Sequence, residues 1–434
     1  MKKLLTGLIL ATLASQALAG GTKRYIVTFD AKAKRGDRDA ALTALNLKAA
    51  KHISTDGDTD QEVSVALVDL PAGQTIETGI GKAFCKDPQK CSLAARRIVS
   101  IESDRRVKWI ESAQVSFQAS PLPSFEGVMA GLKMPNAAAF KNAALNPLAA
   151  KDSAQRSEET WGIQRVHAPS AWSITQGKGV KVAVIDTGID YTHPELTGQV
   201  DGGYSAIAKT ENPSDYMDDN GHGTHVSGTI AAHKDGKGVV GVAPQARLYA
   251  VKVLDADGSG NLSDVIDGIV WAAKNHMDVA NMSLGAPVDS EAMKRAVRFA
   301  RGSGVVIVCA AGNSGGSVGF PGAYDDVIAV AASDKDDKLA SFSSRGPEVD
   351  FIAPGVDIVS SKMGGGFISY SGTSMASPHV AGLAALAVSQ GYVGLNGPDG
   401  VFAQLKKAAS PLATQGMTAE MQGSGMIDAG KLAR

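Results

Sequence analysis

The second half of the sequence alternates between short apolar runs and segments with helical periodicity. The apolar runs are Val180–Ile185, Ala246–Val253, Val279–Met282, Val305–Ala310 and Val327–Ala332, and the helical segments are Gly223–Ala232, Leu262–Asn275 and Ser290–Gly302. A strand that is apolar at almost every position is buried on both faces, which is typical of parallel sheets. We therefore expect an α/β domain with a mostly parallel sheet and helices on both of its faces.

Length and charge limit the remaining possibilities. The chain has 434 residues, which is long enough for two or more domains and a large core. Its formal net charge of −1 argues against nucleic-acid or membrane-surface binding that depends on bulk charge. We therefore expect no nucleic-acid partner.

The N-terminus has the pattern of a secretory signal peptide. Lys2 and Lys3 precede the apolar run Leu4–Leu13, and Ala17 and Ala19 supply small residues before a cleavage point. The apolar run is too short to cross a bilayer. We expect residues 1–19 to be removed, and the mature chain to be secreted, extracellular or periplasmic, without a membrane anchor.

A small α+β domain is expected over residues 20–119. Its predicted strands are Arg24–Phe29, Val63–Val68 and Val107–Phe117, and its predicted helices are Arg38–Lys51 and Leu93–Ile101. Residues 120–157 are rich in Ala, Pro, Asn and Ser without periodicity, which predicts a linker. Residues 158–434 then form the large domain.

The three cysteines suggest two different environments. Cys85 and Cys91 bracket five residues and could close a small disulfide loop in an oxidising compartment. Cys309 lies within an apolar run, so a buried side chain is expected there.

Four polar residues stand at the ends of predicted strands or helices, where chemistry gathers in parallel α/β folds. Asp186 ends the first apolar run, His222 opens a helix, Asn313 follows the run Val305–Ala310, and Ser374 stands at or near a helix N-terminus after Gly372. Each has a simpler interpretation. The Asp-Thr-Gly motif also occurs in aspartic proteases, but no second such motif is present. His222 and His225 have the spacing of metal ligands, but a third ligand is not evident. Asn313 and Ser374 could cap a turn and a helix.

Taken together, the four residues resemble the subtilisin family of serine peptidases, in which Asp, His and Ser occur in this chain order. The resemblance runs from about Trp161 to the C-terminus. It implies that Ser374 attacks a peptide carbonyl, that His222 takes the proton and that Asp186 orients the imidazole. Asn313 and the backbone N–H of Ser374 would bind the oxyanion. His225 is expected to be structural.

The same resemblance implies how polypeptide substrates bind. An extended peptide would pair as an added strand with two segments, Gly258-Ser259-Gly260 and Ser283-Leu284-Gly285. Ala310, Ala311 and Gly312, together with Leu284, would line a pocket for an apolar P1 side chain. Pro321 matches a position that is often cis in the family. Met375, directly after the nucleophile, is expected to be accessible to oxidants.

A structural calcium ion is a further expectation from the family. Glu195 and Asp235 would supply carboxylate oxygens, and His233, Lys237 and Val239 would supply backbone carbonyls. Lys234 and Lys237 add repulsive charge, and the N-terminal Gln ligand of the family is not identifiable. The alternative is an ordinary charged hairpin.

The first domain resembles a subtilisin propeptide, which implies a chaperone and inhibitor that is removed on activation. Slow folding of large parallel sheets gives such a template a physical purpose. The expected protein is therefore a monomeric, secreted serine endopeptidase. The alternatives are an esterase with the same triad and an inactive homologue that only binds peptides.

Overall fold

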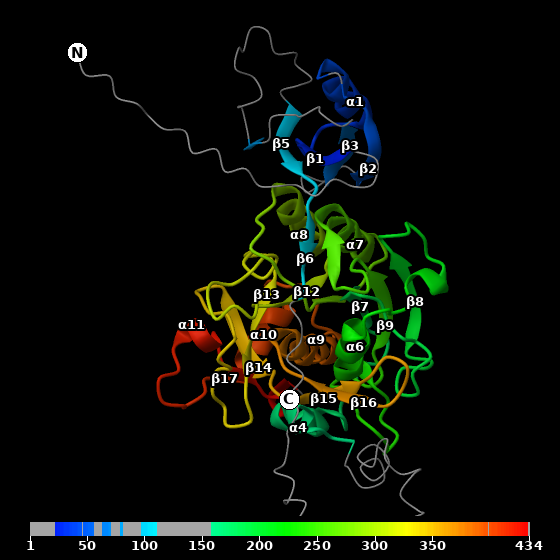
Figure 1. The fold of residues 1–434 in the computed structure, drawn as a ribbon. Helices are drawn as coiled ribbons and strands as arrows, with labels where there is room; N and C mark the ends of the chain where they lie inside the picture. The colour runs from blue at the N-terminus through cyan, green and yellow to red at the C-terminus, as the bar shows by residue number, and fades with distance from the viewer. Residues whose placement is uncertain are drawn as a thin grey trace, which may run out of the picture. The chain divides into compact units, whose positions relative to one another are not determined.

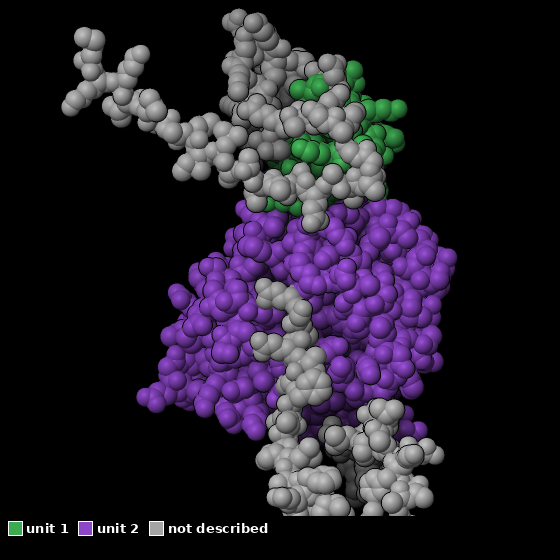
Figure 2. Space-filling view, viewed as in Figure 1, with its two compact units in different colours: residues 1–105 green, residues 106–434 purple. Residues whose placement is uncertain are grey.

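The computed structural model describes residues 22–45, 47–55, 63–70, 79–80, 97–110, 158–397 and 399–432. These residues fall into two compact units, which are residues 1–105 and residues 106–434 (Figure 2). The predicted signal peptide, most of the linker, Cys85 and Cys91 lie outside the described residues. None of the helices in the described ranges is both long and apolar enough to span a membrane.

The first unit is an antiparallel sheet with one described helix. Its strand order is β2-β3-β1-β5-β4. The strands are β1 (Lys23–Phe29), β2 (Ala49–Ser54), β3 (Ser64–Leu70), β4 (Gly79–Ile80) and β5 (Ile98–Ser103), and the helix is α1 (Arg35–Ala44). Val27, Phe29 and Leu42 lie in its buried core. An α+β unit was expected from the sequence.

Two helix predictions in this unit were wrong in part. The helix expected over residues 38–51 ends at Ala44, and the chain enters strand β2 at Ala49. The helix expected over residues 93–101 is contradicted from Ile98 onward, where β5 pairs with β1. Ile98 and Ile101 are buried in the sheet's core, so packing against β1 decides their conformation over local helical propensity.

The second unit contains a nine-stranded sheet with the order β17-β18-β14-β13-β12-β11-β7-β9-β8. All of its neighbouring strands are parallel except β17 and β18. The strands are β7 (Lys181–Asp186), β8 (Val200–Ser205), β9 (Arg247–Lys252), β11 (Val279–Met282), β12 (Val306–Ala310), β13 (Ile328–Ser333), β14 (Val349–Pro354), β17 (Ala409–Ser410) and β18 (Met426–Ile427). The prediction of a mostly parallel sheet is confirmed.

Helices cover both faces of this sheet, as the continuous apolar strands required. Helices α7 (Leu262–Lys274) and α8 (Glu291–Gly302) pack against each other and against β7 and β12. Helices α6 (His222–Ala231) and α9 (Thr373–Ser389) form a second packed pair, and α9 lies across β11 to β14. Figure 1 shows the strands between the two pairs.

The remaining elements are short. They are α4 (Trp161–Arg165), α5 (Ala168–Ala171), a 3₁₀ turn (Pro213–Asp215), α10 (Val401–Ala408), α11 (Ala419–Gln422), α12 (Ala429–Leu432), the strand pair β6 (Arg106–Lys108) and β10 (Ser259–Asn261), and the hairpin β15 (Ile358–Ser361) and β16 (Phe367–Tyr370).

The sequence did not reveal strand β8, because its composition is polar and glycine-rich. Gly203 lies so close to the carbonyl oxygen of Ala250 on β9 that a Cβ atom would overlap it. The close approach of the two backbones therefore requires glycine at this position.

Candidate active site

Asp186 and His222 form a buried pair at the carboxyl end of the sheet. Asp186 is the last residue of β7 and His222 is the first residue of α6. The Nδ1 atom of His222 lies 2.9 and 3.0 Å from the two carboxylate oxygens of Asp186. Because a carboxylate only accepts, Nδ1 is the donor, and the neutral ring then has an unprotonated Nε2. Nε2 is buried without a hydrogen-bond partner in the described part of the chain, so it can accept a proton.

The Asp186 turn is fixed by backbone hydrogen bonds. The N–H of Thr187 donates to Asp186 Oδ1 at 2.7 Å. The N–H groups of Val253 and Leu254 donate to the carbonyl of Asp186 at 2.9 and 3.2 Å. The turn therefore has little freedom to rotate its carboxylate away from the imidazole.

Asp218 joins this turn to the helix that begins with His222, and sequence reasoning missed it. Its carboxylate accepts from Thr187 Oγ1 at 2.8 Å, and from the N–H and Oγ1 of Thr224 at 2.9 and 2.6 Å. It also accepts from the N–H groups of Asn220 and Gly221, both at 3.0 Å. An acidic residue just before a helix N-terminus is a capping signal that could have revealed it.

Ser374 is the second residue of α9, which confirms the predicted place near a helix N-terminus. Its hydroxyl donates to the carbonyl of Ser283 at 3.1 Å. The hydroxyl of Ser283 donates in return to the carbonyl of Ser374 at 2.8 Å. Pro378 stands within the helix, beyond its first turn. It lacks the N–H that would bond to the carbonyl of Ser374, and Ser283 supplies the missing donor.

Asn313 lies beside the N-terminus of α9, with its amide held in one orientation. Its Oδ1 accepts from the N–H and the Oγ1 of Thr373, both at 2.9 Å. The N–H of Gly312 donates to the same Thr373 hydroxyl at 3.1 Å. Since the amide oxygen is occupied, the donor atom Nδ2 is the one directed elsewhere, near Gly372.

The two predicted substrate segments lie on either side of one extended stretch of the chain. Strand β6 pairs antiparallel with β10, with Lys108 opposite Ser259 and Val107 opposite Gly260. The N–H of Gly285 donates to the carbonyl of Trp109 at 3.1 Å. The Trp109 ring Nε1 donates to the carbonyl of Gly260 at 2.9 Å. Both segments thus use their backbone to hold an added strand.

The residues predicted to line a specificity pocket occupy the ends of neighbouring strands. Ala310 ends β12, Ala311 and Gly312 follow it, and Leu284 lies just after β11. The side chains of Leu284, Ala310 and Ala311 are buried. The peptide bond between Phe320 and Pro321 is cis, as expected.

Comparison with known proteins agrees with this geometry. The model of the Subtilase family matches residues 177–425, more than half of the chain. The chain belongs to the subtilase family. All four candidate residues, Asp186, His222, Asn313 and Ser374, lie within the matched range.

Several named subtilases are similar to this chain. A thermophilic serine proteinase of Bacillus sp. (strain AK1) is 50% identical over 234 residues, which are 53% of this chain and 58% of that protein. Subtilisin E of Bacillus subtilis (strain 168) is 52% identical over 236 residues, which are 53% of this chain and 61% of subtilisin E. Subtilisin Savinase of Lederbergia lenta is 46% identical over 271 residues, which are 62% of this chain and 96% of Savinase. The chain therefore spans about three fifths of the length of the first two relatives.

In this subtilase the predicted calcium residues come from two segments, around Glu195 and after α6, that lie next to each other. The N–H of His233 donates to the carbonyl of Glu195 at 3.1 Å. Burial, then Asp235 and Glu158, raise the pKa of Glu195 to about 7. Glu158 was not predicted here, yet its carboxylate accepts from the N–H groups of Asp235 and Gly236 at 3.1 and 2.6 Å. Within the described ranges, no group of three or more His, Cys, Asp or Glu side chains is arranged to hold a metal.

Other polar side chains near the candidate site are buried. His225 and His379 are fully buried, and burial lowers their pKa values to about 3 and about 4. Ser377 Oγ donates to Asn281 Oδ1 at 2.8 Å. Cys309 is buried, as predicted, and burial raises its pKa.

The expectation that Met375 is accessible was wrong. Its exposure is 0%, and it belongs to the main hydrophobic core. Its sulfur lies close to Gly372, as the side-chain amide of Asn313 does, but the side chain is enclosed by the protein, so an oxidant reaches it only when the protein opens locally.

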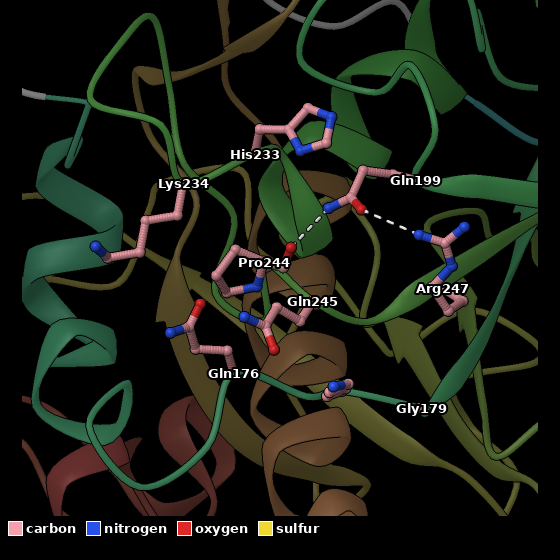
Figure 3. A pocket seen from close by; sticks show the side chains of 9 residues that line it. Gln176, Gly179, Gln199, His233, Lys234, Pro244, Gln245 and Arg247 are labelled. Atoms are coloured by element: carbon pink, nitrogen blue, oxygen red, sulfur yellow. Dashed lines mark hydrogen bonds between the residues drawn. The ribbon is translucent and has the colours of Figure 1, made fainter.

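A separate hollow of about 640 Å³ lies at the opposite, amino end of the strands. Gly179 and Arg247, which lie at the starts of β7 and β9, help to line it together with Gln199 and Lys234 (Figure 3). Arg247 is paired with Asp201. None of the candidate active-site residues lines this hollow.

Proposed function

We propose that the chain is a serine endopeptidase that cleaves extended polypeptides. The buried contact of Asp186 with Nδ1 of His222 carries the proposal, because it leaves Nε2 unprotonated and available as a base. Ser374 is the nucleophile, and Asp186 orients the imidazole and stabilises its charged form. One chain provides all four groups, so a monomer suffices.

Catalysis then proceeds in two half-reactions. Ser374 Oγ attacks the scissile carbonyl carbon while its proton passes to Nε2 of His222. The C–N bond breaks, the imidazolium gives the proton to the leaving amine, and an acyl-enzyme remains on Oγ. Water attacks this ester with His222 again as base, which releases the carboxylate product and restores the hydroxyl.

Asn313 and the backbone N–H of Ser374 stabilise the oxyanion by donating hydrogen bonds to it. Thr373 occupies the amide oxygen of Asn313, which favours Nδ2 as the donor. The N-terminal end of α9 adds a favourable field for developing negative charge.

Substrates bind as an added strand between β10 and the segment Ser283-Leu284-Gly285. The pairing of residues 106–110 with these segments supports this mode, because its ladder of backbone hydrogen bonds is one that any extended peptide can form. Ala310, Ala311, Gly312 and Leu284 line the pocket for an apolar P1 side chain.

Residues 20–119 act as a propeptide that keeps the enzyme inactive until removal. Residues 106–110 pair with the proposed substrate segments. In the intact chain they would therefore compete with polypeptide substrates for these segments. The signal peptide of residues 1–19 directs secretion, the linker of residues 120–157 holds later cleavage points, and residues 158–434 remain as the mature enzyme.

A structural calcium ion completes the proposal. Three segments bring the carboxylates of Glu158, Glu195 and Asp235 near one another, and burial, followed by the charges of Asp235 and Glu158, raises the pKa of Glu195. Such an excess of hard oxygen charge fits calcium. Glu195 and Asp235 would bind it with carbonyls of His233, Lys237 and Val239, and the ion would stabilise the loop.

Digestion of casein tests the proposal against its alternatives. The secreted chain is expected to degrade casein and to hydrolyse a small activated ester, and N-terminal sequencing is expected to give an end between residues 119 and 161. Ester hydrolysis without casein digestion would favour an esterase. Processed protein with neither activity would leave only a peptide-binding homologue.

A further inference from the structure

Lys252 is a buried lysine that no step of the proposed mechanism uses. It is the last residue of β9 and stands opposite Asp186 of β7 in the parallel register. Only 6% of its surface is exposed. A buried ammonium group is costly unless it is paired and hydrogen-bonded, so its surroundings decide whether it is tolerated.

All three ammonium donors of Lys252 have partners. Nζ donates to the carbonyl of Thr187 at 2.6 Å, to the carbonyl of Leu254 at 2.9 Å and to Oδ1 of Asp219 at 2.6 Å. An ammonium has three donors, so this set saturates it. Asp219 also compensates the charge, and its side chain is 52% exposed.

The three partners belong to three segments that adjoin Asp186, His222 and strand β10. Thr187 directly follows Asp186 and donates its N–H to that carboxylate. Leu254 donates its N–H to the Asp186 carbonyl and begins the turn to β10, in which Asp255 N–H bonds to the carbonyl of Ser259. Asp219 lies three residues before His222.

We propose that Lys252 is a positioning residue that couples the Asp186–His222 pair to the substrate-binding strand β10. It fixes the peptide planes of Thr187 and Leu254, on both sides of the Asp186 backbone. Its loss leaves two carbonyls without their donor and lets the carboxylate shift relative to Nδ1 of His222. Misplacement of a catalytic group by about 1 Å costs about 10²-fold in rate.

Lys252→Met keeps an unbranched side chain that is one heavy atom shorter, and it removes the charge and the donors. Because the inference rests on the proposed peptidase function, each preparation is first titrated with a fluorophosphonate to count active sites. Two substrates are then compared, a single-residue ester that cannot reach β10 and an extended tetrapeptide anilide. The control is Lys178→Met, at an exposed lysine before β7.

The expected result is a fall in kcat/KM per titrated site of about 10²-fold for the short ester, with a larger fall for the tetrapeptide. The control is expected to match the wild type. A purely structural lysine would lower only the melting temperature, and a residue that supports β10 alone would spare the ester. Either of these results overturns the proposal.

Asp219→Asn and Lys252→Arg provide the second measurement if Lys252→Met does not mature. Asp219 is half exposed, so its variant is expected to fold, with a smaller loss on both substrates. Arg keeps the charge and the N–H donors, so Lys252→Arg is expected to mature and to retain activity on both substrates. Wild-type kinetics of Asp219→Asn on both substrates would overturn the inference. An unlabelled wild-type protein would instead overturn the proposed function, and this inference with it.

Discussion

Ser283 and Ser374 exchange hydrogen bonds between the end of β11 and the first turn of α9. Ser283 Oγ donates to the carbonyl of Ser374 at 2.8 Å, and Ser374 Oγ donates to the carbonyl of Ser283 at 3.1 Å. The pair fixes the proposed nucleophile against a proposed substrate segment. It also replaces the helical hydrogen bond that Pro378 cannot make.

Ser283→Ala is expected to destabilise the protein by about 1–3 kcal/mol, because the buried carbonyl of Ser374 loses its donor. The Nδ2 of Asn281, which donates to Ser283 Oγ at 2.9 Å, loses its acceptor as well. Denaturant unfolding measures the effect. Ser303→Ala, at the exposed end of α8, serves as the control and is expected to change stability by less than about 0.5 kcal/mol. Equal stability of both variants would contradict the role given to Ser283.

Asn313→Asp separates the two functions of the amide. The carboxylate keeps an acceptor for the N–H and hydroxyl of Thr373 but removes the Nδ2 donor. We expect kcat to fall by about 10²–10³-fold with little change in KM, which is the loss measured when one oxyanion donor is removed from such enzymes. Steady-state kinetics of Asn313→Asp and Asn313→Ala are the measurement. A near-normal kcat in the Asp variant would show that Asn313 only anchors Thr373.

The sequence predicted the positions of the candidate catalytic residues at strand and helix ends better than it predicted the residues that hold them there. Asp186, His222 and Ser374 stand at strand and helix ends within glycine-bearing motifs, so their short-range context reveals them. Lys252 contacts Thr187 and Asp219, which are 65 and 33 residues away in the chain. No local sequence pattern predicts such a contact.

The wrong expectations have the same origin. Met375 follows Ser374 in sequence, but the helix directs it into the core, where its exposure is 0%. The sequence predicted that residues 98–101 form the end of a helix, but they form a strand because they pair with β1. Long-range packing decided both cases, and a single sequence does not display it.

Gly223→Ala is expected to disturb the contact between the His222 helix and the Asp186 turn. A Cβ at Gly223 would overlap the carbonyl oxygen of Gly188, a backbone atom that cannot swing aside. Such overpacking costs about 1–3 kcal/mol and would also shift His222, so kcat/KM falls with stability. Gly202→Ala is the matched control, because its Cβ would lie 3.6 Å from the Tyr249 ring, an ordinary contact. Tolerance of Ala at position 223 would contradict the close approach.

The raised pKa of Glu195 predicts how the stability of the metal-free protein depends on pH. Its pKa is raised from 4.5 to about 7 in the folded chain, so without metal its protonated form contributes stability at low pH. That contribution is lost as pH rises through about 7. In EDTA, the melting temperature is expected to fall across this range in the wild type and to stay flatter in Glu195→Gln.

Calcium is expected to raise the melting temperature of the wild type at pH 8 but not that of Glu195→Gln, because the bound ion compensates the carboxylates. Thermal scans with calcium and with EDTA make the comparison. The calcium proposal fails if EDTA leaves the wild-type melting temperature unchanged.

The most direct test of the account is covalent labelling of Ser374 by a fluorophosphonate, mapped by mass spectrometry. Ser374 Oγ attacks phosphorus, fluoride leaves and His222 takes the proton. We expect one label per processed chain, on the peptide that contains Ser374. The label should be absent in Ser374→Ala and present in Ser377→Ala, whose lost hydroxyl bonds only within the core. Labelling that persists in Ser374→Ala, or processed wild-type protein that takes no label, would contradict the assignment of Ser374 as the nucleophile.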